Sequence, residues 1–223
     1  MAAAGARLAG AGAALPVREP EVSMKLIMSP LSPYARKVRI LIREAGQGEE
    51  IEEIAVATSA FATDPQVKAA HPTARIPVLL RDDAHPLHDS RVITRYLDEL
   101  WSAGLYPSDR LWDVLTLEAA ADGIADSALV MAYEMRLRPE ERQWPEWLDA
   151  HWSKIANALD MLEAEAGQMA ARPIDMGQIA LAAALGYLDL RHDARGWREG
   201  HPLLAGWYEE FARRGSMTAT RPD

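Results

Sequence analysis

The chain has 223 residues, of which 49% are hydrophobic, and its 24 Lys and Arg against 33 Asp and Glu give a net charge of −9. The length suffices for one large domain or two small ones with a hydrophobic core, and the acidic balance disfavours binding to nucleic acid or to an anionic membrane. The sequence has no Cys, which excludes disulfides, thiolate-held metals and a nucleophilic protein thiol.

The composition changes along the chain. Residues 1–23 are rich in Ala and Gly, and we expect a disordered extension there. No stretch approaches the roughly 20 strongly apolar residues of a membrane span. All 7 Trp lie at or after Trp101, and most of the acidic excess lies there too. We therefore expect two domains, 24–101 and 109–223.

The first of these domains alternates strand and helix signals. Short apolar runs predict four strands, and helical spacing after Ser32-Pro33, after Asp64-Pro65 and from Ser90 predicts three helices. The resulting order is βαβ, a linking helix, then ββα. The strands are expected at 25–28, 51–56, 76–80 and 86–88, and the apolar face of the last helix at Val92, Ile93, Tyr96, Leu97 and Leu100.

No convincing strand pattern follows residue 101. Helical patterns over 109–137 and about 141–165 are separated by Pro139, and His201-Pro202 begins a last helix. Between them, Asp175 and Gln178 have the spacing of a capping box. The run 179–188 is apolar on all sides, which predicts a centrally buried helix. The fold class is therefore α/β followed by all-α.

Pro77 stands within the predicted strand 76–80. Proline removes a hydrogen-bond donor from the sheet, so it belongs at an edge or a bulge. A cis Ile76–Pro77 peptide would turn the backbone of Ile76 toward a ligand. A trans proline that starts an edge strand is the alternative.

Two predicted helix starts suit anionic ligands. The N-terminus opened by Ser32 offers unpaired N–H groups that stabilise an anion such as a thiolate, and Arg36 adds positive potential if it faces the same way. At the other start, Ser90 suits a carboxylate and Asp89 an ammonium, which together fit an amino-acid head group. Ordinary N-capping is the alternative at both places.

Several motifs together identify a family. They resemble those of the cytosolic glutathione S-transferases, in family order and spacing over about residues 24–217. The matching segments are S-P-Y-A-R-K-V-R-I (32–40), R-I-P-V-L (75–79), D-S-x-V-I-x-x-Y-L (89–97), D-M-G-Q-I-A-L-A-A-A-L-G-Y-L (175–188) and H-P-x-L-x-x-W-Y-x-x-F-x-x-R (201–214).

The resemblance implies a thioredoxin-like domain that binds glutathione, followed by an all-helical domain. Ser32 takes the position that activates the thiol. In some serine-type members the serine lies two residues before the proline, where this chain has Leu31. Ser29 is the second choice. Tyr34 follows the proline and suggests packing, so a tyrosine-type enzyme is not expected.

The resemblance also implies the remaining glutathione contacts. Ile76, beside cis-Pro77, binds the cysteinyl part through its backbone, and Asp89 and Ser90 hold the γ-glutamyl group. Arg75 belongs to the same segment. There the family's N-P-x-G-K-V-P reads H-P-T-A-R-I-P, with His71 for Asn, Ala74 for Gly and Arg75 for Lys.

The implied function is a cytoplasmic, homodimeric glutathione transferase that conjugates glutathione, as co-substrate, to small electrophiles in detoxification. Candidate electrophile contacts are Trp112, Met131, Tyr133 and Met135. A non-catalytic binding protein of the same fold is the alternative, favoured by the altered segment. A glutathione-dependent isomerase or dehalogenase is a third possibility.

Two further clusters carry no expected chemistry. The segment 82–89 holds three Asp together with His85 and His88. The two His are separated by a proline turn and a short strand, so their rings need not converge and no metal site is expected. No resident cofactor is expected either. Four basic residues on the first predicted helix, Arg36, Lys37, Arg39 and Arg43, are expected to form a solvated face.

Overall fold

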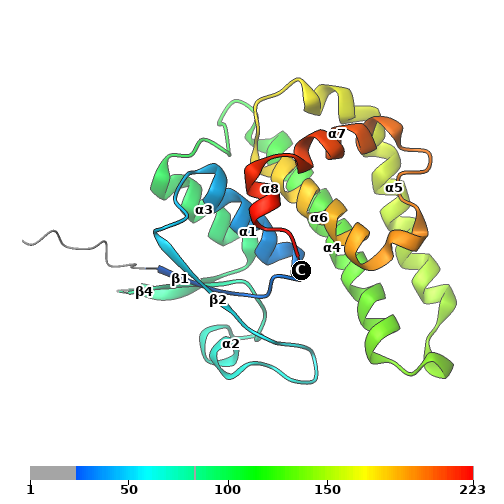
Figure 1. The fold of residues 1–223 in the computed structure, drawn as a ribbon, viewed down its shortest axis with the longest axis horizontal. Helices are drawn as coiled ribbons and strands as arrows, with labels where there is room; N and C mark the ends of the chain where they lie inside the picture. The colour runs from blue at the N-terminus through cyan, green and yellow to red at the C-terminus, as the bar shows by residue number, and fades with distance from the viewer. Residues whose placement is uncertain (1–23, 83, 223) are drawn as a thin grey trace, which may run out of the picture.

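The computed structural model describes residues 24–82 and 84–222, so the predicted extension at 1–23 lies outside the described residues. The chain forms a four-stranded mixed sheet with helices on both faces, followed by a group of packed helices (Figure 1), which confirms the predicted fold class. The strands are β1 (Met24–Met28), β2 (Ile51–Ala55), β3 (Val78–Arg81) and β4 (Ala84–His88). The helices are α1 (Pro33–Glu44), α2 (Pro65–Ala70), α3 (Ser90–Trp101), α4 (Leu111–Leu137), α5 (Pro145–Ala170), α6 (Met176–His192), α7 (Pro202–Ala212) and α8 (Gly215–Ala219), with short 3₁₀ turns at Glu140–Arg142 and Asp193–Arg195.

The sheet has the order β2-β1-β3-β4. β1 pairs with β2 in parallel, so α1 serves as the crossover that a parallel pair needs. β3 is antiparallel to both β1 and β4. Figure 1 shows α1 and α3 on one face of the sheet and α2 on the other.

Pro77 lies just before β3 and not within it, which corrects the expected start at Ile76. A residue without an N–H cannot donate to the ladder, so the strand begins at Val78, two residues after the expected start. The Ile76–Pro77 peptide is cis, as the resemblance implied.

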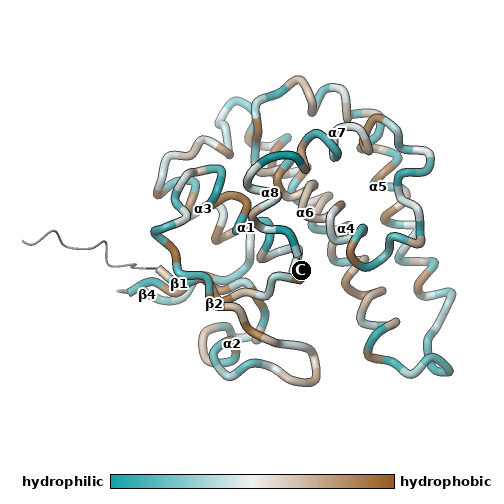
Figure 2. The backbone as a smooth tube through the Cα atoms, viewed as in Figure 1, coloured by the Kyte–Doolittle hydropathy of each residue, from teal (hydrophilic) through white to brown (hydrophobic). Residues whose placement is uncertain are grey.

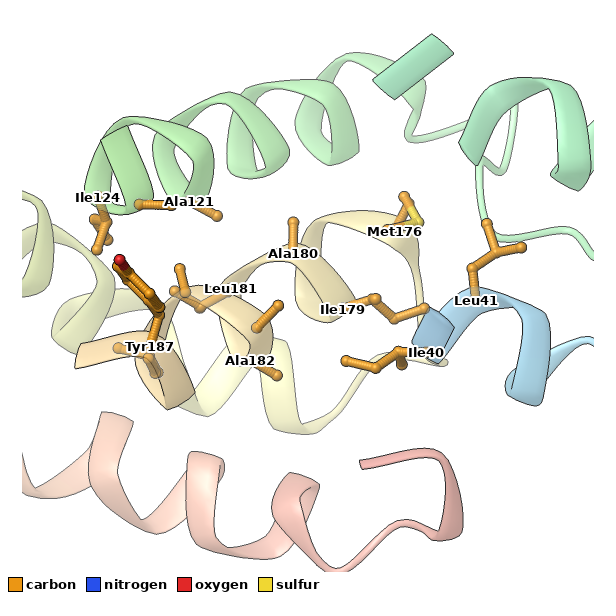
Figure 3. Close-up of a cluster of buried hydrophobic side chains, with 14 of the residues drawn as sticks. Ile40, Leu41, Ala121, Ile124, Met176, Ile179, Ala180, Leu181, Ala182 and Tyr187 are labelled. Carbon is orange, nitrogen blue, oxygen red and sulfur yellow. The ribbon is translucent and has the colours of Figure 1, made fainter. Parts of the chain in front are cut away.

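The hydrophobic core centres on α6. Residues Met176 to Leu188 are all buried, which confirms the helix that is apolar on all sides. Figure 3 shows α6 between α4, which contributes Ala121 and Ile124, and α1, which contributes Ile40 and Leu41. In Figure 2 the tube of α6 is white to brown, whereas the connection between α4 and α5 is largely teal.

The start of α6 is fixed by the predicted capping box. The Asp175 carboxylate accepts from the Gln178 backbone N–H at 3.0 Å, and the Gln178 side chain accepts in return from the backbone of Asp175. Arg110 Nη1 donates to the second Asp175 oxygen at 3.0 Å. The helix is thereby tied to the segment that links the two halves of the chain.

Several expected helix features are wrong in detail. On α3, Ile93 and Leu97 are buried, but Val92 and Leu100 are about half exposed, because α3 packs mainly on α1 and the β3–β4 hairpin and so buries a narrow stripe. The second long helix begins at Pro145, after a single 3₁₀ turn. The short helix α8 was not expected.

The basic residues of α1 do not form a solvated face. Arg36, Lys37 and Arg39 are all at least nine-tenths buried. Arg39 and Arg43 pair with Glu53 on β2, and the partners of Lys37 come from α4. The expectation failed because spacing along one helix does not show the opposite charges that other elements bring to it.

Candidate functional site

The strand register brings three of the expected site segments to one end of the sheet. Ile27, next to the last residue of β1, pairs with Val78, the first residue of β3, and Val78 pairs with His88, the last residue of β4. Neighbouring strands are about 4.8 Å apart. The loop that ends at Ser32, the cis peptide before Val78 and the turn into α3 are therefore neighbours.

Ser32 is the N-cap of α1. Its Oγ accepts from the Ala35 backbone N–H at 3.2 Å. Because the hydroxyl acts there as an acceptor, its own proton remains available for donation to an anion at the helix start.

Ser29 makes its hydrogen bonds within the loop that precedes α1. Its carbonyl accepts from the Ser32 N–H at 3.0 Å, and its Oγ lies 3.4 Å from the backbone N of Leu31. Ser32 thus stands at the helix N-terminus itself, and Ser29 one turn before it.

The loop before Ile76 keeps a tight turn despite its altered residues. His71 Nδ1 accepts from the Thr73 backbone N–H at 3.0 Å, the same contact to the residue two positions on that an Asn side chain makes in an Asx turn. Ala74 has φ +52°, in the left-handed region that favours glycine. Arg75, which follows, is exposed.

Asp89 and Ser90 form the turn into α3. Asp89, with φ +69°, caps the helix by accepting from the Arg91 N–H at 2.9 Å. Partial burial raises the pKa of Asp89, but hydrogen bonds from Arg91 outweigh it and hold that pKa below its ordinary value. The carboxylate is therefore anionic at neutral pH and partly exposed, as an ammonium partner requires. Ser90 is buried beside it.

A buried charge network behind this turn escaped the sequence analysis. Lys37 Nζ lies 3.0 Å from Glu118 Oε1 and 2.9 Å from Asp122 Oδ1. Arg91 Nε lies 3.7 Å from the other Asp122 oxygen. The signal available in the sequence was the spacing of Glu118, Asp122 and Asp126, which places three acids on one face of an otherwise apolar helix.

Tyr34 adds a further contact between α1 and α4, one turn of α4 beyond the contact of Lys37 with Asp122. Its hydroxyl donates to Asp126. Burial, together with Asp126, raises the pKa of Tyr34 far above its ordinary value. The single Tyr34 hydroxyl proton is thus directed at Asp126 and is not free to be donated to a thiolate.

A cleft of about 640 Å³ follows along the same face of α4. Val130 and Glu134 line it, four and eight residues beyond Asp126, so the cleft begins one helical turn after the Tyr34 contact. Ala60 and Phe61, in the connection between β2 and α2, form the opposite wall.

The four expected electrophile contacts do not lie together. Tyr133 lines the cleft, but Met131 is fully buried in the core, and Met135 and Trp112 are exposed and do not line it. Trp112 is in the first turn of α4, roughly 30 Å from Tyr133 at 1.5 Å per residue. Aromatic and Met residues at helical spacing point in several directions, and only one face of α4 meets the cleft.

Over residues 24–82 and 84–222, no three His, Asp or Glu side chains are grouped in a way that could hold a metal ion. The His88 ring lies against His71, with centroids 4.3 Å apart. No helix in this part of the chain is long and apolar enough to cross a membrane.

Comparison with known protein families gives two matches. Residues 31–100 match the model for the glutathione S-transferase N-terminal domain, and residues 145–210 match the model for the C-terminal domain. The chain is also 34% identical over 205 residues to the uncharacterized GST-like protein YibF of Escherichia coli K12, covering 89% of this chain and 98% of that protein.

Two similar crystal structures contain glutathione. A glutathione transferase family member from Pseudomonas fluorescens Pf-5, with bound glutathione, is 44% identical with a TM-score of 0.87, covering 90% of this chain and all of that one. A glutathione S-transferase from Methylobacillus flagellatus KT, with glutathione bound, is 33% identical with a TM-score of 0.82 and the same coverage.

Proposed function

The chain belongs to the glutathione S-transferase family, and from that premise we propose that it binds glutathione and conjugates it to small electrophiles. One observation carries the proposal: the strand register gathers Ser32, the Ile76–Pro77 peptide and the Asp89-Ser90 turn at one end of the sheet. Those are the groups that a thiol, a peptide backbone and an amino-acid head group would each need.

The proposed binding mode assigns one part of glutathione to each segment. The γ-glutamyl ammonium faces Asp89, and its carboxylate faces Ser90 and the first N–H groups of α3. The backbone of Ile76 pairs with the cysteinyl residue, and Arg75 adds a positive charge at the edge of the site. The thiol then lies at the start of α1.

Ser32 is proposed to stabilise the thiolate. A free thiol has a pKa near 8.5 and is mostly protonated at pH 7. The Ser32 hydroxyl proton and the N-terminus of α1 both favour the anion. Each unit by which they lower the thiol pKa requires about 1.4 kcal/mol of preferential stabilisation. Ser29 remains the second choice for this role.

In the conjugation step, the thiolate sulfur forms a bond to an electrophilic carbon of the acceptor. With an aryl halide or an epoxide, the bond from that carbon to the halide or the ring oxygen breaks, and the leaving atom takes the electron pair. With an unsaturated carbonyl compound, the π pair of the double bond moves toward the carbonyl, and the α-carbon then takes a proton from water. The proposed acceptor site is the cleft between Phe61 and the Val130 face of α4, one helical turn from Tyr34.

The proposal extends to the setting of the enzyme. Conjugation of small electrophiles fits a role in detoxification, with glutathione as a co-substrate that leaves with the product. A cytoplasmic homodimer is proposed from the family resemblance. No permanently bound cofactor or metal is part of the proposed reaction.

A second candidate is glutathione binding without turnover. The similarity to YibF, a relative called GST-like and uncharacterized, favours keeping it. The altered loop at His71 no longer favours this second candidate, because the His71–Thr73 contact preserves an Asx-like turn. Glutathione-dependent isomerisation and dehalogenation are further reactions of the proposed thiolate.

Two measurements on the full chain test the proposal. Titration calorimetry with glutathione at millimolar concentration should show one site per chain, and absence of binding would refute both candidates. Turnover is then measured over a panel of aryl halides, epoxides and unsaturated carbonyl compounds. Conjugates support the transferase if their mass is that of glutathione plus acceptor for the epoxides and unsaturated carbonyl compounds, and that sum less hydrogen halide for the aryl halides. Binding with no product from any acceptor supports the second candidate.

A further inference from the structure

The cleft along α4 is apolar at one end and basic at the other. Val130 lines it one helical turn after the Tyr34 contact, close to the proposed position of the thiol, and Phe61 forms part of the opposite wall. Arg138 and Arg142 also line it, from the C-terminal end of α4 and the 3₁₀ turn that follows. At 1.5 Å per residue, Arg138 lies about 12 Å beyond Val130 along the axis of α4. A ligand that spans the cleft therefore meets an apolar wall first and a pair of arginines at the far end.

The lining holds one acid, Glu134, and its charge is already balanced within the protein. Glu134 Oε1 accepts from the Trp144 backbone N–H at 3.0 Å, and Oε2 lies 3.3 Å from Arg138 Nε. Within residues 24–82 and 84–222, no ion pair engages Arg142. The far end of the cleft thus keeps an excess of positive charge, although the whole chain is acidic.

Hydrogen bonds tie the connection that carries these arginines to the end of α4. Gln143 Nε2 donates to the carbonyls of Met135 and Arg138, at 3.0 and 3.1 Å. The Arg142 N–H donates to the Pro139 carbonyl at 2.9 Å, and the Arg142 carbonyl accepts from Arg138 Nη1 at 3.3 Å. The connection is therefore held in one turn, and both arginines stay at the same end of the cleft.

We propose that the acceptor is an elongated electrophile with a carboxylate at the end remote from its reacting carbon. This inference rests on the proposed transferase function and names the class of its acceptor. The reacting carbon lies beside the thiol, the apolar body packs between Phe61 and Val130, and the carboxylate faces Arg138 and Arg142. A guanidinium presents its N–H groups as a planar fork that matches the two oxygens of a carboxylate. Because both arginines are exposed, each contributes modestly.

The test uses 4-acrylamidobenzoate and the matched uncharged 4-acrylamidobenzamide. Both carry the same alkene, and the group that differs stands across the ring from it. In the reaction the thiolate sulfur bonds to the terminal alkene carbon, the π pair moves toward the carbonyl, and the α-carbon takes a proton from water. Each conjugate therefore has the summed mass of glutathione and probe. Rates are corrected for the uncatalysed reaction, measured for each probe without protein.

The benzoate should be the better acceptor. Its kcat/KM should exceed that of the benzamide about tenfold, as two exposed charge pairs allow. Most of the difference should lie in KM, because a charge remote from the reacting carbon binds the ground state and the transition state equally. The preference should shrink as NaCl is added, since salt screens exposed charges.

Three variants locate the carboxylate. Arg138→Gln and Arg142→Gln should each reduce the preference for the benzoate about threefold, the share of one exposed charge pair. The double variant should accept the two probes equally. Arg136→Gln is the matched control, because it removes the same charge from an exposed side chain of α4 that does not line the cleft. It should keep the wild-type preference.

A binding measurement separates this inference from the transferase activity. The two conjugates, prepared chemically, are titrated into the full chain by calorimetry beside free glutathione, and the benzoate conjugate should bind about tenfold more tightly. If this difference is found and the double variant removes it, but no acceptor is turned over, the transferase proposal fails and the carboxylate subsite stands.

The inference itself is overturned by any of three results, whether or not conjugation occurs. They are equal binding of the two conjugates, a preference that the double variant keeps or the Arg136 variant loses, and binding of glutathione without binding of either conjugate. If neither glutathione nor a conjugate binds, this inference and the proposed function fail together.

Discussion

Lys37 on α1 and Glu118 on α4 form a buried ion pair 3.0 Å long, with their side chains 1% and 0% exposed. Glu118 also accepts a hydrogen bond from the Tyr106 hydroxyl at 2.9 Å. The pair joins the two halves of the protein directly behind the proposed site. Because neither side chain is exposed to water, removal of one charge leaves the other buried without solvation.

Replacing Lys37 with Met should therefore lower the free energy of unfolding by about 3–5 kcal/mol, because Glu118 and Asp122 lose their cation while they remain buried. Chemical denaturation measures the effect. The matched control is Lys25→Met: Lys25 pairs with Glu52 at the same 3.0 Å but about half exposed, so we expect a loss below about 1 kcal/mol. Equal losses in the two variants would show that the buried pair has no special role.

Ser32→Ala should reduce kcat/KM for conjugation about 10- to 100-fold at pH 6.5, because the thiolate loses a hydrogen-bond donor. The deficit should shrink toward pH 9, where the thiol ionises without help. The pH profile of the initial rate measures this. If the Ser32→Ala enzyme kept the wild-type profile across pH 6–9, Ser32 would not be the residue that stabilises the thiolate.

Three controls accompany that profile. Ser29→Ala should keep the wild-type profile, and so should Tyr34→Phe, because the Tyr34 hydroxyl donates its proton to Asp126 and not to a thiolate. Ser32→Ala also loses a helix cap, worth about 1 kcal/mol. Asp64→Ala, which removes the N-cap of α2, shows what a lost cap alone does to the rate.

Ala74→Gly should stabilise the protein by about 1 kcal/mol, because φ +52° is unfavourable for a residue with a Cβ. The midpoint of denaturant unfolding measures the change. Ala45→Gly is the control: Ala45 ends α1 with φ −76°, where glycine gains nothing and should lower stability by about 0.5–1 kcal/mol. Loss of stability in both variants would contradict the steric argument.

The stability of the protein without glutathione should fall as the pH drops below about 6.5, where an unfolded His gains its proton. Burial lowers the pKa of His71. The nearby His88 and Arg75 lower it further, and Asp89 opposes the shift. The folded state thus binds this proton later than the unfolded state, so acid favours unfolding between the two pKa values.

His71→Asn isolates that contribution. Asn keeps an acceptor for the Thr73 N–H but does not titrate. The fall in stability between pH 7 and pH 5 should be shallower than in the wild type. His151 and His192, whose pKa values are also lowered by burial, leave part of the slope. His85→Gln, at an exposed position of β4, is the control, and an unchanged slope in His71→Asn would exclude His71 as a contributor.

Much of the fold was predictable because local signals agreed with one another. The Ser32-Pro33 start of α1, the capping box at Asp175 and the fully apolar α6 each have a physical cause within a few residues of sequence. The segments proposed to bind glutathione were also found, because helix starts and an unusually placed proline stand out locally. Their roles stay predictions.

The rest depends on contacts between distant elements. Whether Lys37 is solvated or buried is decided by Glu118, 81 residues further on. The burial of Arg36 likewise depends on Gly186 of α6, which leaves room for the guanidinium, and on the Met217 carbonyl, which accepts a hydrogen bond from it. The face of α4 that meets the cleft is set by the seam with α1, so Tyr133 and Met135, two residues apart, have different surroundings.

The 27-residue α4 divides into two parts at Ala132, the last of its buried residues. Up to that point the helix shares the core with α6. Beyond it, Tyr133, Met135 and Leu137 are partly exposed, and two of them line the cleft. Substitutions in this outer part change the walls of the cleft while the core stays packed. The shape of the cleft is therefore free to diverge in evolution without loss of the folded state.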